Sequence, residues 1–316
     1  MKQVTVISGK GGTGKTVITA AFAALAKNKV MADCDVDASD LHLLLRPRIK
    51  ETHQFKGGLK AQLHEEKCTG CDRCIEVCRF DAISKREGQG ARDKDQGSKG
   101  KGQGSEGQGS RGQGAVLIDP VACEGCQVCA LVCPVEAIQM KENVSGEWFV
   151  SDSDYGPMVH AKLGVAQENS GKLVTVVRQN AREIAQKHSL RLVMVDGPPG
   201  IGCPVIASIT GVDLVVIVTE PTFSAISDLK RVLGLTKHFR IRSVVLINKH
   251  DLNPDNTKSI EAFCQEEEVE VIGKLPFDNV FTEAMIEGKN IIEHSDSPVA
   301  GEIKTIWERV HTGIDE

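Results

Sequence analysis

Residues 9–16 read GKGGTGKT and match the phosphate-binding pattern G-x-x-x-x-G-K-[ST]. The apolar run KQVTVIS precedes them and a helix is expected over 15–27, which is the strand–loop–helix context that the pattern requires. Glycines let successive backbone N–H groups point at an anion, and the start of the helix adds the positive end of its dipole. The stretch therefore predicts a P-loop, with Lys15 on the β- and γ-phosphates and the Thr16 hydroxyl on Mg²⁺. The expected nucleotide contacts are Gly9, Lys10, Gly11, Gly12, Thr13, Gly14, Lys15, Thr16 and Val17.

Short apolar runs rich in β-branched residues recur along the chain, separated by segments of helical length. They are KVMADCD (29–35), LRLVMVD (190–196), DLVVIVTE (213–220), IRSVVLIN (241–248) and VEVIGKLPF (269–277). This spacing is typical of βαβ units and a parallel sheet. The predicted fold is α/β, a P-loop NTPase with a mostly parallel, doubly wound sheet.

Acidic residues follow two of these strands, at the sheet edge where ligands bind in α/β folds. The segment DCDVDASD offers Asp33, Asp35 and Asp37 as candidates to orient a water molecule or to reach the metal ion. Asp196 ends another strand and precedes a glycine-rich turn, as the acid of a Walker B motif does. These carboxylates are the candidates for chemistry at the γ-phosphate.

Composition argues against several classes of partner. The 316-residue chain has a formal net charge of -5 and only 4% aromatic residues, so neither nucleic acid nor an anionic membrane surface is expected as a partner. No signal-peptide pattern opens the sequence, and no apolar run approaches the ~18 residues of a membrane span. The expected location is the cytoplasm, where the eleven cysteines favour metal binding over disulfides.

Eight of the eleven cysteines form two runs with the spacing C-x2-C-x2-C-x3-C. Bacterial two-cluster ferredoxins have this spacing, and in them the fourth cysteine of each run ligates the other cluster. The predicted ligands of two [4Fe–4S] clusters are Cys68, Cys71, Cys74 and Cys133 for the first, and Cys123, Cys126, Cys129 and Cys78 for the second. Zinc is the alternative for such a set of thiolates.

The cysteine runs interrupt the α/β pattern. We expect one P-loop domain built from residues 1–58 and 141–316, with a small ferredoxin-like α+β insert over 59–140. Within the insert, residues 88–114 are rich in Gly, Gln and Ser and have little apolar surface to bury. They are therefore predicted to form a flexible loop.

Taken together, Lys10 within KGGTGKT, the acidic DCDVD and the turn DGPPG resemble the MinD/ParA branch of P-loop ATPases, whose relatives include the nitrogenase iron protein. With the cysteine runs added, nearly the whole chain resembles MinD-superfamily ATPases that carry an inserted two-[4Fe–4S] ferredoxin domain. In that branch the early lysine reaches the partner's phosphates across a nucleotide-sandwich dimer. The resemblance implies that Lys10 acts in trans, that Asp35 positions the attacking water, and that Asp196 holds Mg²⁺ through its water shell.

The base pocket leaves two nucleotides open. INKHD (247–251) spells N-K-x-D, which reads guanine in regulatory GTPases and makes GTP the alternative through Asp251. By resemblance to the MinD-like branch, Asn248 instead contacts adenine, and the loop LPFD, with Pro276, covers the base. ATP is the favoured ligand.

The combined expectation is an ATP-hydrolysing iron–sulfur protein that works as a homodimer, or as a heterodimer with a paralogue. ATP would be coupled to electron transfer or to the assembly of a metal or iron–sulfur cofactor on a client protein. The alternative is a MinD/ParA-like positioning switch whose clusters are structural or redox-sensing.

Overall fold

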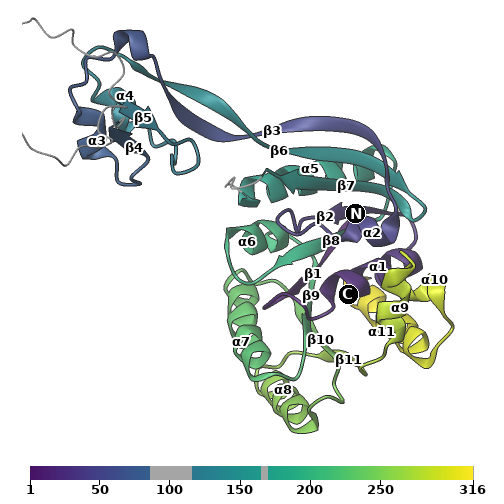
Figure 1. The fold of residues 1–316 in the computed structure, drawn as a ribbon. Coiled ribbons are helices and arrows are strands. Elements are labelled where there is room, and N and C mark those ends of the chain that lie inside the picture. The colour runs from purple at the N-terminus through teal and green to yellow at the C-terminus, as the bar shows by residue number, and fades with distance from the viewer. Residues whose placement is uncertain (86–115, 165–169, 316) are drawn as a thin grey trace, which may run out of the picture. The chain divides into compact units, whose positions relative to one another are not determined.

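The computed structural model describes residues 1–85, 116–164 and 170–315 (Figure 1). Along the chain its elements are β1 (Lys2–Ser8), α1 (Lys15–Leu25), β2 (Lys29–Asp33), α2 (Leu41–Leu45), β3 (Arg48–Leu63), the 3₁₀ turn η1 (Glu65–Lys67), α3 (Arg73–Val77), β4 (Ile83–Lys85), β5 (Val116–Ile118), α4 (Val128–Leu131), β6 (Ile138–Ser153), β7 (Gly156–Leu163), α5 (Ser170–Lys187), β8 (Leu192–Pro199), α6 (Cys203–Ile209), β9 (Leu214–Thr219), α7 (Phe223–His238), β10 (Ser243–Asn248), α8 (Pro254–Glu266), β11 (Val271–Leu275), α9 (Val280–Ile286), α10 (Ile291–His294) and α11 (Pro298–Asp315). The predicted loop over 88–114 lies outside the described residues.

A nine-stranded sheet organises the larger part of the chain, in the order β11-β10-β9-β1-β8-β2-β7-β6-β3. The strands from β11 to β7 pair in parallel, whereas β6 runs antiparallel to β7. The central strands β1, β8 and β9 are buried almost throughout, because helices cover both faces of a parallel sheet. The predicted α/β P-loop fold with a mostly parallel sheet is confirmed.

Two helical layers cover the strands from β11 to β7 (Figure 1). On one face, α1 and α11 pack with the strands in a hydrophobic core that includes Phe22 and Trp307. On the other face, α5 packs over β2, β7 and β8, and α6, α7 and α8 pack over β1, β9 and β10. The layers leave the carboxyl ends of the strands free to form a site.

The chain divides into two compact units. One comprises Met1–Phe55 with Ser145–Glu316, and the other comprises Lys56–Val144, which contains the expected insert of 59–140. The second unit has its own small core, in which β4 and β5 form an antiparallel pair and apolar side chains pack around the buried Cys74, Cys123 and Cys129.

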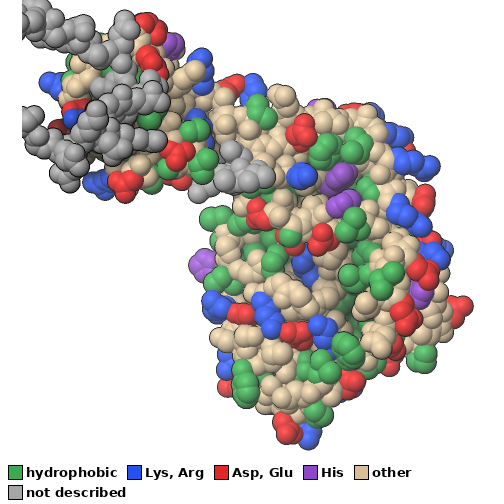
Figure 2. All heavy atoms as spheres, viewed as in Figure 1, with side chains coloured by type: hydrophobic (Ala, Val, Ile, Leu, Met, Phe, Trp, Pro, Cys, Tyr) green, Lys and Arg blue, Asp and Glu red, His purple; other side chains and the backbone are tan. Residues whose placement is uncertain are grey.

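On the face of the molecule shown in Figure 2, basic and acidic side chains are interspersed, with no broad region of one sign. Among the described helices, none combines the length and apolarity that crossing a bilayer requires.

Candidate nucleotide site and cysteine cavities

The P-loop connects β1 to α1 and borders a pocket of about 450 Å³. Gly12 and Gly14 have φ values of 82° and 91°, in the left-handed region that favours glycine. Gly14 is also the N-cap of α1, so the loop delivers its backbone N–H groups to the start of that helix. The pocket is lined by Ser8, Gly11, Gly12, Thr13, Gly14, Lys15, Thr16, Val17, Asp35, Ala38, Asp40, Pro199, Asn248, Lys249, Pro276, Phe277, Asp278, Phe281, Thr282 and Met285.

Lys15 lies at the centre of a cluster of polar side chains that extends from the pocket wall into the buried interior. Its Nζ is 3.0 Å from Asp196 Oδ1 and 3.3 Å from Asp35 Oδ2. The hydroxyls of Thr16 and Thr19 also donate to the Asp196 carboxylate, at 3.0 and 2.9 Å. The structure thus brings together the four residues predicted to serve the phosphates and the metal ion, and adds Thr19, which no sequence pattern had singled out.

Burial and mutual proximity govern the charges of this cluster. Burial lowers the pKa of Lys15, but the carboxylates of Asp196 and Asp35 outweigh burial and leave it raised overall. Burial raises the pKa of Asp35, and the neighbouring Lys15 offsets part of that rise. Burial and the nearby Asp196 raise the pKa of Asp33 to about 8. Lys15 is therefore held in its cationic form. Its charge offsets part of the cost of ionising the buried Asp33 and Asp35.

The side-chain hydroxyl of Thr13 in the P-loop is free to bind a ligand. This residue is 1% exposed, and its Oγ1 has no hydrogen-bond partner among the described residues. A buried hydroxyl without a partner costs about 1–3 kcal/mol, which a phosphate oxygen at this position would relieve. The P-loop residues therefore fit the phosphates of a nucleoside triphosphate.

Asn248 braces the P-loop from the end of β10. Its Nδ2 donates to Thr13 O at 2.8 Å, and its Oδ1 accepts from Lys249 N at 3.0 Å. A Cβ at Gly14 would lie 2.4 Å from Asn248 Nδ2, so only glycine permits this approach. Asn248 lines the pocket as expected, but its described hydrogen bonds hold the loop.

The segment expected to cover the base lies at the pocket. Pro276, Phe277 and Asp278 line it, and Phe277 N donates to Asp251 Oδ1 at 2.7 Å. Asp251 does not line the pocket and its carboxylate anchors the covering loop. The acid of N-K-x-D thus has a structural partner in the covering loop.

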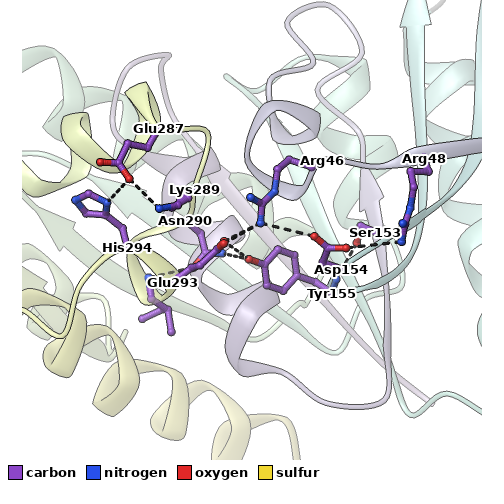
Figure 3. Close-up of polar contacts among 11 residues, drawn as sticks. Arg46, Arg48, Ser153, Asp154, Tyr155, Glu287, Lys289, Asn290, Glu293 and His294 are labelled. Atoms are coloured by element: carbon purple, nitrogen blue, oxygen red, sulfur yellow. Dashed lines mark hydrogen bonds and ion pairs between the residues drawn. The ribbon is translucent and has the colours of Figure 1, made fainter.

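Helix α10 follows α9, which lines the pocket, and polar side chains tie it to two other segments of the same unit (Figure 3). Both carboxylate oxygens of Glu293 accept from Arg46 Nη2 at 2.9 Å, and Tyr155 Oη donates to Glu293 Oε2 at 2.6 Å. Asn290 Nδ2 donates to the same Tyr155 Oη at 2.6 Å. Because Arg46 follows α2 and Tyr155 lies in the β6–β7 turn, the network fixes α10 to both.

Lys10 is absent from the residues that line the pocket, and its side chain contacts the segment after β9. Its Nζ is 2.8 Å from Glu220 Oε1 and donates to Thr222 Oγ1 and Ser224 Oγ, at 3.0 and 3.1 Å. The three acceptors come from the β9–α7 connection and the first turn of α7. They carry no motif of their own and are more than 200 residues away in the sequence, so sequence reasoning did not find them.

Two cavities in the Lys56–Val144 unit gather the cysteines. One is lined by Cys68, Cys71, Cys74 and Cys133. The other is lined by Cys78, Cys123, Cys126 and Cys129. Each cavity thus combines three cysteines of one run with the fourth cysteine of the other, as the ferredoxin spacing implies.

The two cysteine loops have the same backbone conformation. Gly70 and Gly125 have φ values of 66° and 67°, and Asp72 and Gln127 have φ values of 58° and 69°. A Cβ at Gly125 would lie 2.1 Å from Leu59 O, so the second loop requires glycine there. The chain thus repeats one loop geometry, once for each cavity.

The cysteines surround each cavity without meeting at one point. Among the described residues, no three His, Cys, Asp or Glu side chains are placed to hold a single metal ion. Tetrahedral zinc requires four ligand atoms about 2.0–2.3 Å from one centre. Backbone N–H groups also point at the sulfurs, since Ala137 N donates to Cys133 Sγ at 3.2 Å. Each cavity offers four thiolates, the number of protein ligands that a [4Fe–4S] cluster takes.

The fold and the P-loop define a nucleotide-binding protein of the P-loop class. Similarity to known proteins identifies the family within this class. Residues 4–291 match the family described as "CobQ/CobB/MinD/ParA nucleotide binding domain". The chain belongs to this family and is a P-loop ATPase of the MinD/ParA type. The cell division ATPase MinD of Pyrococcus furiosus has the same fold, with a TM-score of 0.55, 16% identity, and 98% of each chain covered.

Three relatives are similar in sequence. An uncharacterized protein of Methanocaldococcus jannaschii is 28% identical over 314 residues, which cover 98% of this chain and 96% of the relative. An iron–sulfur cluster carrier protein of Pyrococcus horikoshii is 25% identical over 158 residues, 46% of this chain and 54% of the relative. Ferredoxin-3 of a Nostoc species is 29% identical over 76 residues, 23% of this chain and 67% of the relative.

Proposed function

We propose that this ATPase is an iron–sulfur protein in which ATP binding and hydrolysis control electron transfer by two [4Fe–4S] clusters. The observation that carries the proposal is the crossed arrangement of the cysteines around two cavities in one unit. The partial similarity to a ferredoxin and to an iron–sulfur cluster carrier supports it. When bound, such clusters supply one-electron chemistry at low potential.

The ligands would be shared between the runs. Cys68, Cys71, Cys74 and Cys133 would hold the first cluster, and Cys123, Cys126, Cys129 and Cys78 the second. Four protein thiolates complete the ligation of each cluster, which favours resident electron carriers over a cluster that is handed to a client. Delivery of a metal or iron–sulfur cofactor is the competing outcome of the experiments below.

ATP would act through assembly of two subunits. In this proposal Lys15 and Thr16 bind the β- and γ-phosphates and Mg²⁺, Asp196 holds the metal through water, and Asp35 orients the attacking water. Lys10 reaches the phosphates of the second subunit, as an arginine finger supplies charge that arrives only with assembly. The assembly is a homodimer or a heterodimer with a paralogue, and its client is a redox protein.

Iron analysis of anaerobically reconstituted variants tests the cluster assignment. The wild-type protein should bind about eight iron and eight sulfide per chain. Cys74→Ser and Cys133→Ser should each lose about half of the iron, and the double variant should lose no more than either single one, because both residues hold one cluster. The matched control is Cys203→Ser, because Cys203 is exposed and lines neither cavity. This variant should keep all of the iron.

A different pattern would contradict this assignment. If Cys74→Ser combined with Cys133→Ser abolished both clusters, the two residues would not share one. If the protein bound stoichiometric zinc and no iron under anaerobic reconstitution, the iron–sulfur proposal would fail. Transfer of intact cluster to an apo-ferredoxin, without oxidation and reduction cycling, would favour the carrier function.

A further inference from the structure

The ammonium group of Lys10 is saturated within its own subunit. A lysine ammonium has three N–H donors. In this structure they meet three acceptors, the Glu220 carboxylate at 2.8 Å and the hydroxyls of Thr222 and Ser224 at 3.0 and 3.1 Å. A phosphate in another subunit therefore competes with these acceptors for Lys10.

Glu220 is the charged member of this set and is held in place. Its side chain is 13% exposed, and its second oxygen is 3.1 Å from Lys249 Nζ. Lys249 also donates to Gly12 O at 3.2 Å. One carboxylate oxygen of Glu220 thus contacts Lys10 of the P-loop, and the other contacts a lysine that is bonded to the P-loop. Burial pushes the pKa of Glu220 upward, but the hydrogen bonds from Lys10 and Lys249 prevail and hold it below its usual range.

We infer that Glu220 is a positioning residue that holds Lys10 in the unassembled subunit and thereby limits how readily two ATP-bound subunits associate. The inference rests on the proposed function, in which Lys10 acts across a dimer. Of these three acceptors Glu220 is the one whose charge is opposite to that of Lys10, and Coulomb attraction across 2.8 Å at a partly buried site makes it the largest part of the hold. Removing its charge while keeping its size should release Lys10 for the partner.

The experiment measures dimer formation by the full chain, with its clusters reconstituted, in a non-hydrolysable ATP analogue and Mg²⁺. Sedimentation velocity gives the dimer dissociation constant, and ATPase activity against protein concentration gives the same midpoint under turnover. Glu220→Gln removes the charge but keeps an acceptor oxygen, and it should tighten the dimer by about five- to tenfold, because each of the two Lys10 residues in a homodimer is then held about two- to threefold less firmly. Ser224→Ala, which removes a neutral acceptor, should shift it in the same direction by about two- to threefold.

Two controls assign the effect to Lys10. Lys249→Met removes the second contact of Glu220 together with the Lys249 bond to Gly12 O, so its ATP affinity is measured alongside. With the nucleotide site saturated, a dimer as tight as that of Glu220→Gln would show that the effect runs through Lys249 and overturn the inference. In a Lys10→Ala background, Glu220→Gln should have no effect on the dissociation constant. An equal tightening in that background would also overturn it.

The outcomes separate this inference from the function on which it rests. If Lys10→Ala alone dimerises and hydrolyses ATP as the wild type does, the trans role of Lys10 is wrong. If Lys10→Ala is impaired but Glu220→Gln leaves the dimer unchanged or weaker while still binding ATP, the trans role stands and the holding role of Glu220 is wrong. Circular dichroism checks that each variant is folded.

Discussion

The side-chain amide of Asn248 donates to the backbone carbonyl of Thr13 at 2.8 Å, although 235 positions separate the two residues. This bond fastens the end of β10 to the P-loop at the point where Gly14 has a φ of 91°. The conformation of the phosphate-binding loop therefore depends on a residue from a different strand of the sheet.

Asn248→Ala should weaken ATP binding about fivefold, because a neutral hydrogen bond contributes about 1 kcal/mol. Asn248→Asp should be worse, by tenfold or more, because it places a carboxylate oxygen against the Thr13 carbonyl. Titration calorimetry with ATP and Mg²⁺ measures both. Equal affinities for the two variants would mean that Asn248 acts through the base alone.

Asp251→Ala should lower the affinity for ATP about threefold, since Phe277 N loses its acceptor and the covering loop loses its anchor. Asp251→Asn keeps an oxygen for Phe277 N and should bind ATP as the wild type does. Competition experiments with GTP provide the check, because neither substitution should change the preference for ATP over GTP. A selective change in GTP affinity would show that Asp251 reads the base.

Gly125→Ala should prevent assembly of the second cluster, because its Cβ would lie 2.1 Å from Leu59 O and its φ of 67° is strained for alanine. The iron content should fall by about half. The matched control is Gly301→Ala in α11, where nothing lies within 4 Å of the new Cβ, and its iron content should be unchanged. A Gly125→Ala protein with full iron would place the second cluster elsewhere.

His160 makes stability depend on pH. Burial, assisted by the nearby His42, lowers the pKa of His160 to about 4, and its Nε2 lies 2.9 Å from Ser151 Oγ. Between the unfolded value near 6.5 and the folded value near 4, the unfolded chain binds the additional proton. The contribution of His160 to stability is therefore complete above pH 6.5 and is lost as the pH falls toward 4.

Denaturant unfolding at pH 7 and pH 5 measures this effect. The wild type should lose about 1–2 kcal/mol more of its free energy of unfolding than His160→Gln does over that interval. Equal losses would mean that His160 titrates normally in the folded state.

The parallel strands and the P-loop were predictable from the sequence for a physical reason. β1, β8 and β9 are buried on both faces, so their runs are continuously apolar and bounded by turns. Asp33 ends β2 as the sequence indicates, whereas Asp196, expected to end its strand, lies inside β8, which continues to Pro199. The two acids are nevertheless paired across the sheet near its carboxyl edge, because parallel strands end at one edge.

Two exposed strands and two long-range contacts could not be predicted from the sequence. β3 and β6 are 16 residues long, yet most of their side chains are at least partly exposed, so no apolar alternation marks them as strands. The contacts of Lys10 with Glu220 and of Asn248 with Thr13 join residues more than 200 positions apart. Only the folded sheet brings these pairs together.

If ATP controls the iron–sulfur chemistry of this chain, a reduction titration should respond to the bound nucleotide. The two clusters of the reconstituted protein are reduced at a series of set potentials, without nucleotide, with ADP and with ATP, and their electron paramagnetic resonance signals are recorded. We expect ATP to change the midpoint potential or the rate of electron transfer to an acceptor. Lys15→Ala, which removes the proposed phosphate contact, should abolish the change. Potentials and rates that are the same in all three nucleotide conditions would contradict this expectation.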